Sequence, residues 1–420
     1  MNISIAKAWD YWLGIPVCFV LSVWDKAGKL FSLGQSEKGE LKKIMFIEFS
    51  EMGSVVLAQP AINKAIKEYK NSEFYFWTFK ENQDIISLLN IIPEKNIITI
   101  RTSNLLLLFK DILDSIRRIQ KEKIDAVVDM ELFSRFSGIL SYLSGAKVRV
   151  GFHKYKIEGL YRGNLHTHKV QYNPYFHISK NFSFLVDSLN VCLEDVPLLK
   201  SQQGNVEFCL PKLQVSDQDK DEAWERIKSV LDSPVKPGND KESGSNIGGG
   251  DDIGKGSKII IVHFSPNDKI DVRRWPLEYY CQLIEKILEN QGIFVVIAGI
   301  GPADTGFFLA NERCVNLIGK TTVKELISLF SIAHVLISYD SGISHLACLT
   351  NIHIITLFGP ESPLLYGPLT DNKKVFYKKF ACSPCLSAYN HRSSVCKDNK
   401  CMRAITVDEV YEEAVRIIQQ

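Results

Sequence analysis

Side chains that could hold an anion and move a proton occur together in three short segments of the chain. The first is Ser50-Glu51-Met52-Gly53-Ser54. The carboxylate of Glu51 could act as a general base, and Gly53 permits a tight turn in which backbone N–H groups approach an anion or an oxyanion. Ser54 offers a hydroxyl in the same turn. An ordinary strand-to-helix turn explains the acid equally well, because the helix dipole favours a negative charge there.

The second segment contains Ser265 and the run Arg273-Arg274-Trp275-Pro276. Proline is tolerated at the start of a helix. Arg273 and Arg274 therefore stand directly before a predicted helix, where two guanidinium groups can clamp phosphate oxygens through bidentate hydrogen bonds. A basic loop exposed to solvent is the alternative interpretation.

The third segment is Asp340-Ser341-Gly342-Ile343-Ser344-His345. Asp340 and Ser341 are typical helix-capping residues, and Gly342 lets the backbone approach a ligand closely. Ser341 and His345 are four residues apart, so they share one helix face. The segment therefore predicts a polar ligand site, with a helix cap and a hydrogen-bonded structural histidine as the alternative.

Four cysteines near the C-terminus have a spacing that allows two interpretations. They are Cys382, Cys385, Cys396 and Cys401, in the order C-x2-C-x10-C-x4-C. This pattern can be a zinc knuckle, with His391 as a further possible ligand. We treat the four as weak metal candidates and favour structural cysteines, either reduced or disulfide-linked.

These segments are expected at the ends of strands in two α/β domains. Apolar runs predict strands, and helical spacing predicts helices between them, so each half should form a doubly wound parallel sheet. The expected strands are 44–49, 74–79, 97–100, 126–130, 148–152, 258–264, 293–298, 315–317, 335–339 and 353–357, and the expected helices are 55–69, 105–120, 276–290 and 322–333. Ligands bind at the carboxyl ends of such strands, so we expect a cleft between two sheets.

The chain divides at a segment that is poor in apolar residues. Residues 234–257 are mostly Gly, Ser, Asp and Lys, and such a composition predicts a flexible linker insertion. We therefore expect an N-terminal arm over residues 1–40, a first domain over 41–233 and a second domain over 258–420, which carries the cysteine-rich segment 382–401.

The N-terminal arm contains an uncharged stretch over residues 11–24. It is shorter than the roughly 17–25 apolar residues of a membrane-spanning helix, and it includes Gly14 and Pro16. Trp9, Trp12 and Trp24 suit a membrane surface, where an indole keeps one edge in water. We expect a membrane-surface anchor. A hydrophobic arm packed on its own domain, or a signal or spanning segment, remains open.

The overall composition is that of a globular protein. The 420 residues include 50 Lys and Arg against 48 Asp and Glu, so the net charge is +2, which disfavours nucleic-acid binding. Ten cysteines are too few for a disulfide scaffold and favour a reduced, cytoplasmic chain. The sequence contains no Walker A motif and no complete G-x-G-x-x-G fingerprint.

Four motifs, in order, resemble those of glycosyltransferase family nine, the lipopolysaccharide heptosyltransferases. RRWP at 273–276 is similar to the family's K/R-R/H-W-P motif, and DSGISHLA at 340–347 is similar to D-S/T-G-x-x-H-L-A. VNLIGKTT at 315–322 and TLFGPESP at 356–363 resemble two further family segments. The resemblance covers about residues 42–415, interrupted by the linker.

The resemblance implies a GT-B fold, in which two Rossmann-like domains face a cleft. It implies an inverting, metal-independent transfer of heptose from ADP-heptose, without a cofactor, to a lipid-linked lipopolysaccharide acceptor at the inner face of the cytoplasmic membrane. Arg273 would neutralise the leaving diphosphate, with Ser265 and Arg274 near it. The remaining donor contacts that the resemblance implies are Asp340, Ser341, Gly342 and His345.

One departure from the family pattern concerns the catalytic base. The family's first loop usually reads S-x-G-D, with the aspartate as base, and here that position is Ser54. We therefore expect Glu51 to replace it. Two alternatives are a family member that uses another nucleotide-sugar and a homologue that binds a nucleotide-sugar, or acts as a scaffold, without catalysis.

A group of basic residues in the first half could meet acceptor phosphates or carboxylates, or could form a solvated loop. The group consists of Lys147, Arg149, His153, Lys154, Lys156 and Arg162.

Overall fold

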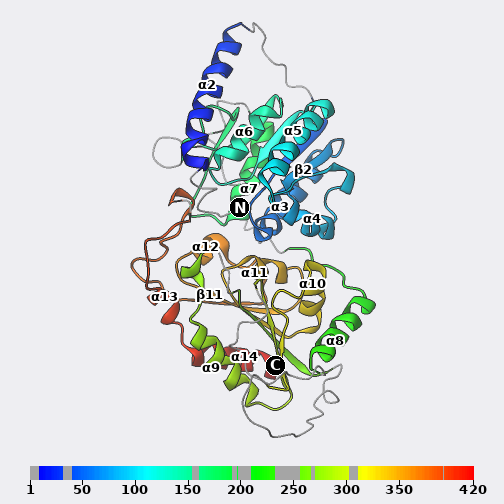
Figure 1. Cartoon of the computed structure of the whole chain (residues 1–420), viewed down its shortest axis with the longest axis vertical. Coiled ribbons are helices and arrows are strands. Elements are labelled where there is room, and N and C mark those ends of the chain that lie inside the picture. The colour runs from blue at the N-terminus through cyan, green and yellow to red at the C-terminus, as the bar shows by residue number, and fades with distance from the viewer. Residues whose placement is uncertain are drawn as a thin grey trace. The chain divides into compact units, whose positions relative to one another are not determined.

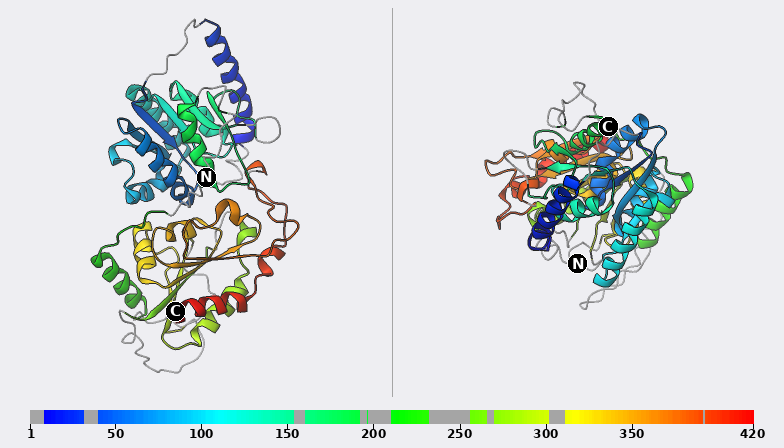
Figure 2. Two further views of the ribbon diagram at one scale, coloured as in Figure 1. Left: turned by 180° about the vertical axis from the view of Figure 1, so that it is seen from behind. Right: turned by 90° about the horizontal axis from the view of Figure 1, so that it is seen from above.

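The chain forms two compact units, each built on a six-stranded parallel sheet (Figures 1 and 2). The computed structural model describes residues 9–31, 40–153, 160–191, 196, 210–231, 256–265, 270–301, 311–390 and 392–420. Unit 1 comprises Met1–Phe208 with Leu386–Ser393, and unit 2 comprises Cys209–Cys385 with Ser394–Gln420. Residues 234–255 of the expected linker lie outside the described residues.

The sheet of unit 1 has the strand order β3-β2-β1-β4-β5-β6. Its strands are β1 (Lys43–Ile47), β2 (Glu73–Phe79), β3 (Ile97–Ile100), β4 (Ala126–Asp129), β5 (Val148–His153) and β6 (His168–Gln171). The central strands are buried along almost their whole length, as is usual for a parallel sheet covered by helices on both faces.

Helices cover both faces of this sheet. They are α2 (Gly14–Phe31), α3 (Met52–Glu68), α4 (Gln83–Leu89), α5 (Leu105–Glu122), α6 (Arg135–Leu143) and α7 (Ile178–Asp187). Side chains of α5 and α6 share one apolar cluster with the strands, including Leu108 and Leu140. The right-handed crossovers of such a fold place α3 on the opposite face, where it packs on α7. Helix α2 packs on α6.

The sheet of unit 2 repeats this arrangement, with the order β12-β11-β10-β7-β8-β9. Its strands are β7 (Lys258–His263), β8 (Ile293–Ala298), β9 (Cys314–Asn316), β10 (Val335–Tyr339), β11 (His353–Phe358) and β12 (Lys373–Tyr377). Its helices are α8 (Asp217–Leu231), α9 (Leu277–Leu288), α10 (Val323–Ile332), α11 (Gly342–Ala347), α12 (Pro363–Tyr366), α13 (Lys400–Arg403) and α14 (Val407–Gln419). The core joins α9 and α14 to the strands.

Both sheets therefore have a topological switch point, where the strand order reverses. It lies between β1 and β4 in unit 1 and between β7 and β10 in unit 2. Loops that follow these strands meet at the carboxyl edge of each sheet, and ligands of doubly wound folds bind there. The expectation of two α/β domains with parallel sheets is confirmed.

The observed division of the chain differs from the one expected at residue 233. Helix α8 precedes the linker segment in sequence, yet it packs on α10 and belongs to unit 2. The short segment Leu386–Ser393 belongs to unit 1, where Tyr389 packs against the rings of Phe133 and Tyr172. Strands β6 and β12 lie at sheet edges and were not expected from the sequence.

The uncharged N-terminal stretch forms most of helix α2. Its Pro16 lies in the first turn, where proline is compatible with a helix. Among the described helices, none is both long enough and apolar enough to cross a membrane.

Candidate functional site

Two loop clusters carry the candidate functional residues, one at the switch point of each sheet. The clusters lie in different units.

In unit 2, His263 links the loops that follow three strands. It ends β7, and its ring Nδ1 lies 3.0 Å from Ser338 Oγ and 3.2 Å from Ser341 Oγ. Its Nε2 lies 3.0 Å from Ser265 Oγ, which also accepts a hydrogen bond from the backbone N–H of Ile300. His263 therefore connects the carboxyl ends of β7, β8 and β10. No sequence motif marked His263, although a histidine at the end of an apolar strand was a visible signal.

Close backbone contact holds two of these loops together. A Cβ atom at Gly299 would lie 1.8 Å from the carbonyl oxygen of Phe264. Only glycine fits at that position, because any side chain would push apart the loops after β7 and β8. The loops after β7 and β8 are thus in close contact at the switch point.

Arg273 and Asp340 meet across the switch point. Arg273 ends a short 3-10 helix (Asp271–Arg273), and its Nη1 lies 3.6 Å from Oδ2 of Asp340. Both side chains are almost completely buried, with exposed fractions of 4% and 5%. The pair places a fixed positive charge beside a carboxylate and the hydroxyl groups around His263. Such a group of donors suits an anionic ligand.

The other residues of RRWP have different surroundings. Arg274 is partly exposed and pairs with Asp271 at 2.7 Å, so the two arginines do not form a common clamp. Trp275 is buried and donates from Nε1 to the carbonyl oxygen of Ile405. This bond fixes the start of α9 on the C-terminal segment.

The third predicted segment lies where expected but is not capped as expected. Ser341 occupies the N-cap position of α11, yet its side chain makes no capping bond and instead contacts His263 and Ser338. Gly342 begins α11, and His345 lies one turn later, buried. The hydroxyl of Ser341 therefore belongs to the polar cluster and not to the helix end.

The glycine-containing motif at 315–322 has a structural explanation. Gly319 has a φ of +67°, in the left-handed region that favours glycine. Thr322 and Glu325 form a reciprocal capping box at the start of α10. This motif shapes a turn and a helix start.

In unit 1, Glu51 stands at the start of α3. It is the N-cap residue, its side chain makes no capping bond, and it is partly exposed at the carboxyl edge of the sheet. Gly53 and Ser54 lie in the first turn of α3. The prediction that Gly53 forms a tight turn is wrong, because a helical conformation follows Glu51 immediately.

Two buried acids hold the loop before Glu51. Glu131 Oε1 accepts from the backbone N–H of Phe49 at 2.7 Å and from Ser50 Oγ at 2.9 Å, while Glu48 Oε1 accepts from the N–H of Ser50 at 3.0 Å. Burial, together with the charge of Glu131, raises the pKa of Glu48 well above its ordinary value. Burial and the charge of Asp129 raise the pKa of Glu131.

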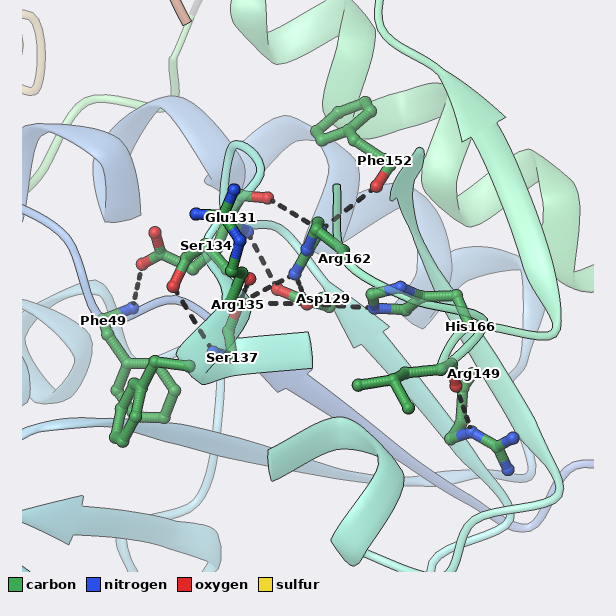
Figure 3. Close-up of polar contacts among 12 residues, drawn as sticks. Phe49, Asp129, Glu131, Ser134, Arg135, Ser137, Arg149, Phe152, Arg162 and His166 are labelled. Atoms are coloured by element: carbon green, nitrogen blue, oxygen red, sulfur yellow. Dashed lines mark hydrogen bonds and ion pairs between the residues drawn. The ribbon is translucent and has the colours of Figure 1, made fainter. Parts of the chain in front are cut away.

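A second buried network lies beside Glu131 (Figure 3). Asp129, at the end of β4, pairs with Arg162 and accepts from Ser137 Oγ and His166 Nε2, both at 3.0 Å. Burial opposes its charge, but Arg162 and these hydrogen bonds outweigh burial, so the pKa of Asp129 is lowered. Burial and the charge of Arg162 lower the pKa of His166 to about 4, which keeps this histidine neutral.

The predicted basic group does not form one surface. Arg162 is completely buried with Asp129. Arg149 is buried and donates to the carbonyl oxygens of Leu165 and Ala146. His153 contacts the carbonyl oxygen of Gly163, and Lys147 is exposed. Lys154 and Lys156 lie outside the described residues, as do residues 266–269 of the second segment.

The four C-terminal cysteines are free thiols in the structure. Burial, with repulsion from the other three cysteines, raises the pKa of Cys401 to about 11. Within the described part of the chain, no three His, Cys, Asp or Glu side chains are grouped so that they could hold a metal ion. His391 lies outside the described residues.

Comparison with known proteins identifies the family of the chain. The sequence pattern of glycosyltransferase family 9 (heptosyltransferase) matches residues 112–395. Lipooligosaccharide heptosyltransferase 2 of Haemophilus influenzae is 32% identical over 124 residues, which are 27% of this chain and 36% of that protein. The matched segments of the curated relatives cover between 34% and 47% of their own lengths.

Solved structures share the fold. ADP-heptose lipopolysaccharide heptosyltransferase II of Escherichia coli has a TM-score of 0.63 at 18% identity, over 90% of this chain and 99% of that one. Escherichia coli heptosyltransferase WaaC with ADP has a TM-score of 0.57 at 16% identity, over 89% and 99%. The two parallel-sheet units thus correspond to a GT-B fold. With a family match over more than half of its length, the chain belongs to glycosyltransferase family 9.

Proposed function

We propose that this protein is an inverting glycosyltransferase that moves heptose from ADP-heptose onto a lipid-linked lipopolysaccharide core saccharide. Family membership supports the reaction class. A solved structure with the same fold holds ADP, which supports the nucleotide.

The observation that carries the proposal is the buried Arg273–Asp340 pair at the switch point of unit 2. When the bond between the sugar and the diphosphate breaks, negative charge develops on the departing oxygen. A fixed guanidinium group stabilises that charge without reorganisation, because Asp340 already holds it in place. Ser265 and Ser341 both contact His263. Their hydroxyl groups can donate to phosphate or sugar oxygens.

Glu51 supplies the base in this proposal. Its carboxylate takes the proton of the acceptor hydroxyl as that oxygen attacks the anomeric carbon. The bond between this carbon and the diphosphate oxygen breaks, and ADP leaves with the electron pair. A single displacement of this kind inverts the configuration at the anomeric carbon. Arg273 provides the positive charge, so the step needs no metal ion and no cofactor.

The lipid-linked acceptor places the reaction at the inner face of the cytoplasmic membrane in this proposal. The N-terminal arm is proposed as the part of the chain that contacts the membrane surface.

Calorimetric titration with ADP, UDP, GDP and CMP, without divalent metal, tests the donor. Selective binding of ADP is the expected result, and preference for another nucleotide would assign another donor. Ser54, at the position of the family's aspartate, favours a second candidate, a nucleotide-sugar-binding protein without catalysis. Transfer of heptose from ADP-heptose to a core acceptor decides between the two.

A further inference from the structure

Helix α2 is fixed to unit 1 through a stripe of small residues. Gly14, Cys18 and Ser22 are four residues apart, and all three are buried. A Cβ at Gly14 would lie 2.9 Å from Arg135, and one at Gly163 would lie 2.5 Å from Ser22 Oγ. Ser22 Oγ also accepts from the backbone N–H of Asn164 at 2.6 Å. This contact is close enough that α2 forms part of the surface of unit 1.

Ionic contacts hold the helix at two points. Asp10, just before α2, accepts from the backbone N–H of Arg135 at 2.9 Å and pairs with its guanidinium at 3.0 Å. Asp25 lies 3.7 Å from the guanidinium of Arg149. Arg135 and Arg149 are themselves buried. Both acids therefore fix the rotation of α2 about its own axis.

This rotation turns the large apolar side chains outward. No charged residue occurs between Asp10 and Asp25, and the outward residues are 40–73% exposed. They are Tyr11, Trp12, Leu13, Val17, Phe19, Val20, Val23 and Trp24. A helix on a water-soluble surface normally turns such residues inward, so an exposed patch of this kind marks an interaction site.

Helix α5 adds a second exposed apolar stripe in the same layer. Leu105, Leu106, Phe109 and Leu113 are 46–79% exposed and lie within its first three turns. Helix α6 lies between α2 and α5 in Figures 1 and 2. Helices α5 and α6 begin after β3 and β4, at the carboxyl edge of the sheet. The start of α2 lies at the same edge, because Asp10 contacts Arg135 at the start of α6. Glu51 lies at this edge as well.

We propose that the outward faces of α2 and of the first turns of α5 together dock unit 1 on an anionic lipid bilayer. This inference rests on the proposed function, in which the acceptor is a lipid-linked saccharide. Such a saccharide would extend from the bilayer next to the edge of the sheet that carries Glu51. In this arrangement α2 lies parallel to the membrane. Its contacts with unit 1 hold it in one orientation, which a flexible tether would not have.

Three features favour a bilayer over a second copy of the chain. Trp12, just before α2, and Trp24, within it, stand toward the two ends of the outward face, as suits a helix lying at one depth in the interfacial layer. Aliphatic residues fill the space between them. Exposed Lys26, Lys110 and Lys147 lie on or beside α2, α5 and α6, where they complement anionic headgroups.

Flotation of the full-length protein with vesicles tests the inference without any sugar substrate. Vesicles of phosphatidylglycerol and phosphatidylethanolamine should bind the wild type, and the double variants Trp12→Ser/Trp24→Ser and Leu106→Ser/Phe109→Ser should each weaken the partition coefficient about tenfold or more. These side chains are exposed, so the variants should fold. Tyr175→Ser is the matched control. Tyr175 is 77% exposed just before α7, on the other side of the sheet, and its loss should leave binding unchanged.

Two outcomes would overturn the inference. One is equal vesicle binding by the wild type and both double variants. The other is a concentration-dependent dimer in sedimentation that Trp12→Ser/Trp24→Ser abolishes, which would assign the surface to a second copy. Transfer to a vesicle-embedded acceptor and to a delipidated, water-soluble acceptor separates docking from catalysis. Docking variants should raise the KM for the embedded acceptor alone, whereas failure of the proposed function would abolish transfer to both while vesicle binding persists.

Discussion

The guanidinium of Arg273 lies 3.6 Å from the carboxylate of Asp340, and both groups are almost completely buried. Hydrogen-bonded pairs of this kind are about 2.7–2.9 Å apart, so the contact is electrostatic and not a tight fork-to-fork bond. The aspartate thus holds the buried guanidinium charge in place. A buried charge held in this way is suited to a leaving group that gains negative charge.

Replacement of Arg273 should affect both stability and donor binding. Arg273→Ala leaves the Asp340 carboxylate buried without its counter-charge, and we expect the free energy of unfolding to fall by about 3 kcal/mol. ADP binding should be lost. Arg273→Lys keeps the charge without the planar fork, so it should recover most of the stability but little of the affinity for ADP. Chemical denaturation and calorimetry measure the two effects.

Arg274→Ala is the matched control for this prediction. Arg274 is partly exposed and pairs with an exposed acid, Asp271, and exposed pairs contribute about 0–1 kcal/mol. We expect stability and ADP affinity close to those of the wild type. If Arg274→Ala loses ADP binding and Arg273→Ala retains it, Arg274 binds the phosphate and our proposal names the wrong arginine.

The role of Glu51 can be tested by moving the base. Glu51→Gln should lower the rate of transfer by about 10²–10⁴-fold, the usual contribution of a general base, with ADP affinity unchanged. Ser54 lies one turn further along α3, at the position where the family pattern has aspartate. Adding Ser54→Asp to Glu51→Gln should therefore restore part of the rate. Initial rates with ADP-heptose and a core acceptor are the measurement.

The interpretation of this pair depends on the single variants. Ser54→Asp alone should retain transfer, since Glu51 is still present. Full activity of Glu51→Gln would show that Glu51 is not the base. Damage to the loop would also leave Glu51→Gln inactive. In that case Ser54→Asp fails to restore activity and ADP binding is lost as well.

Strand and helix periodicity predicted most of the fold, because buried parallel strands are continuous apolar runs. Ile97–Ile100, Ile293–Ala298 and Val335–Tyr339 were predicted to the residue. Edge strand β12 was missed because all of its residues are exposed or partly exposed, so no buried apolar run marks it. The position of α8 was missed because its packing on α10 is a long-range contact that local sequence does not encode.

The candidate site was predictable only where a motif marked it. Arg273, Asp340 and Ser341 were found from their motifs, and the structure brings them to one switch point. Glu48 and Glu131 were missed because each is a single acid beside an apolar strand, and their proximity arises from the pairing of β1 with β4. Spacing along the chain cannot reveal such a contact.

Glu48, one of the two buried acids that hold the loop before Glu51, should make the free energy of unfolding depend on pH. Because the pKa of Glu48 is raised, the folded protein retains a proton that the unfolded chain releases above its ordinary value of 4.5. The stability gained from this proton is complete below that value and is lost as pH rises toward the raised pKa. From about pH 5 upward, stability relative to Glu48→Gln should fall by up to about 1.4 kcal/mol per pH unit.

Comparison with Glu48→Gln measures the contribution of the coupled pair that Glu48 forms with Glu131. His166 acts in the opposite direction, since its pKa is lowered from 6.5 to about 4, and the stability of its neutral form is lost as pH falls through that range. His166 is present in both proteins, so its effect cancels in the difference. Urea denaturation of both proteins between about pH 5 and 8 is the measurement. Parallel stability curves would show that Glu48 does not hold a proton in the folded state.

Two glycine substitutions test whether α2 is fixed to unit 1. Gly163 has a φ of +65°, and a Cβ there would lie 2.6 Å from the carbonyl oxygen of Cys18. Gly163→Ala should therefore push α2 away at a cost of about 2 kcal/mol or more, and trypsin should cleave after Lys26 faster than in the wild type. A Cβ at Gly28, within α2, meets no atom within 4 Å. Gly28→Ala should leave cleavage unchanged or slower, because alanine stabilises a helix interior by up to about 1 kcal/mol. Equal cleavage rates in both variants would mean that α2 is not held by this contact, and that the outward orientation of Trp12 and Trp24 is not fixed by the small residues on its inner face.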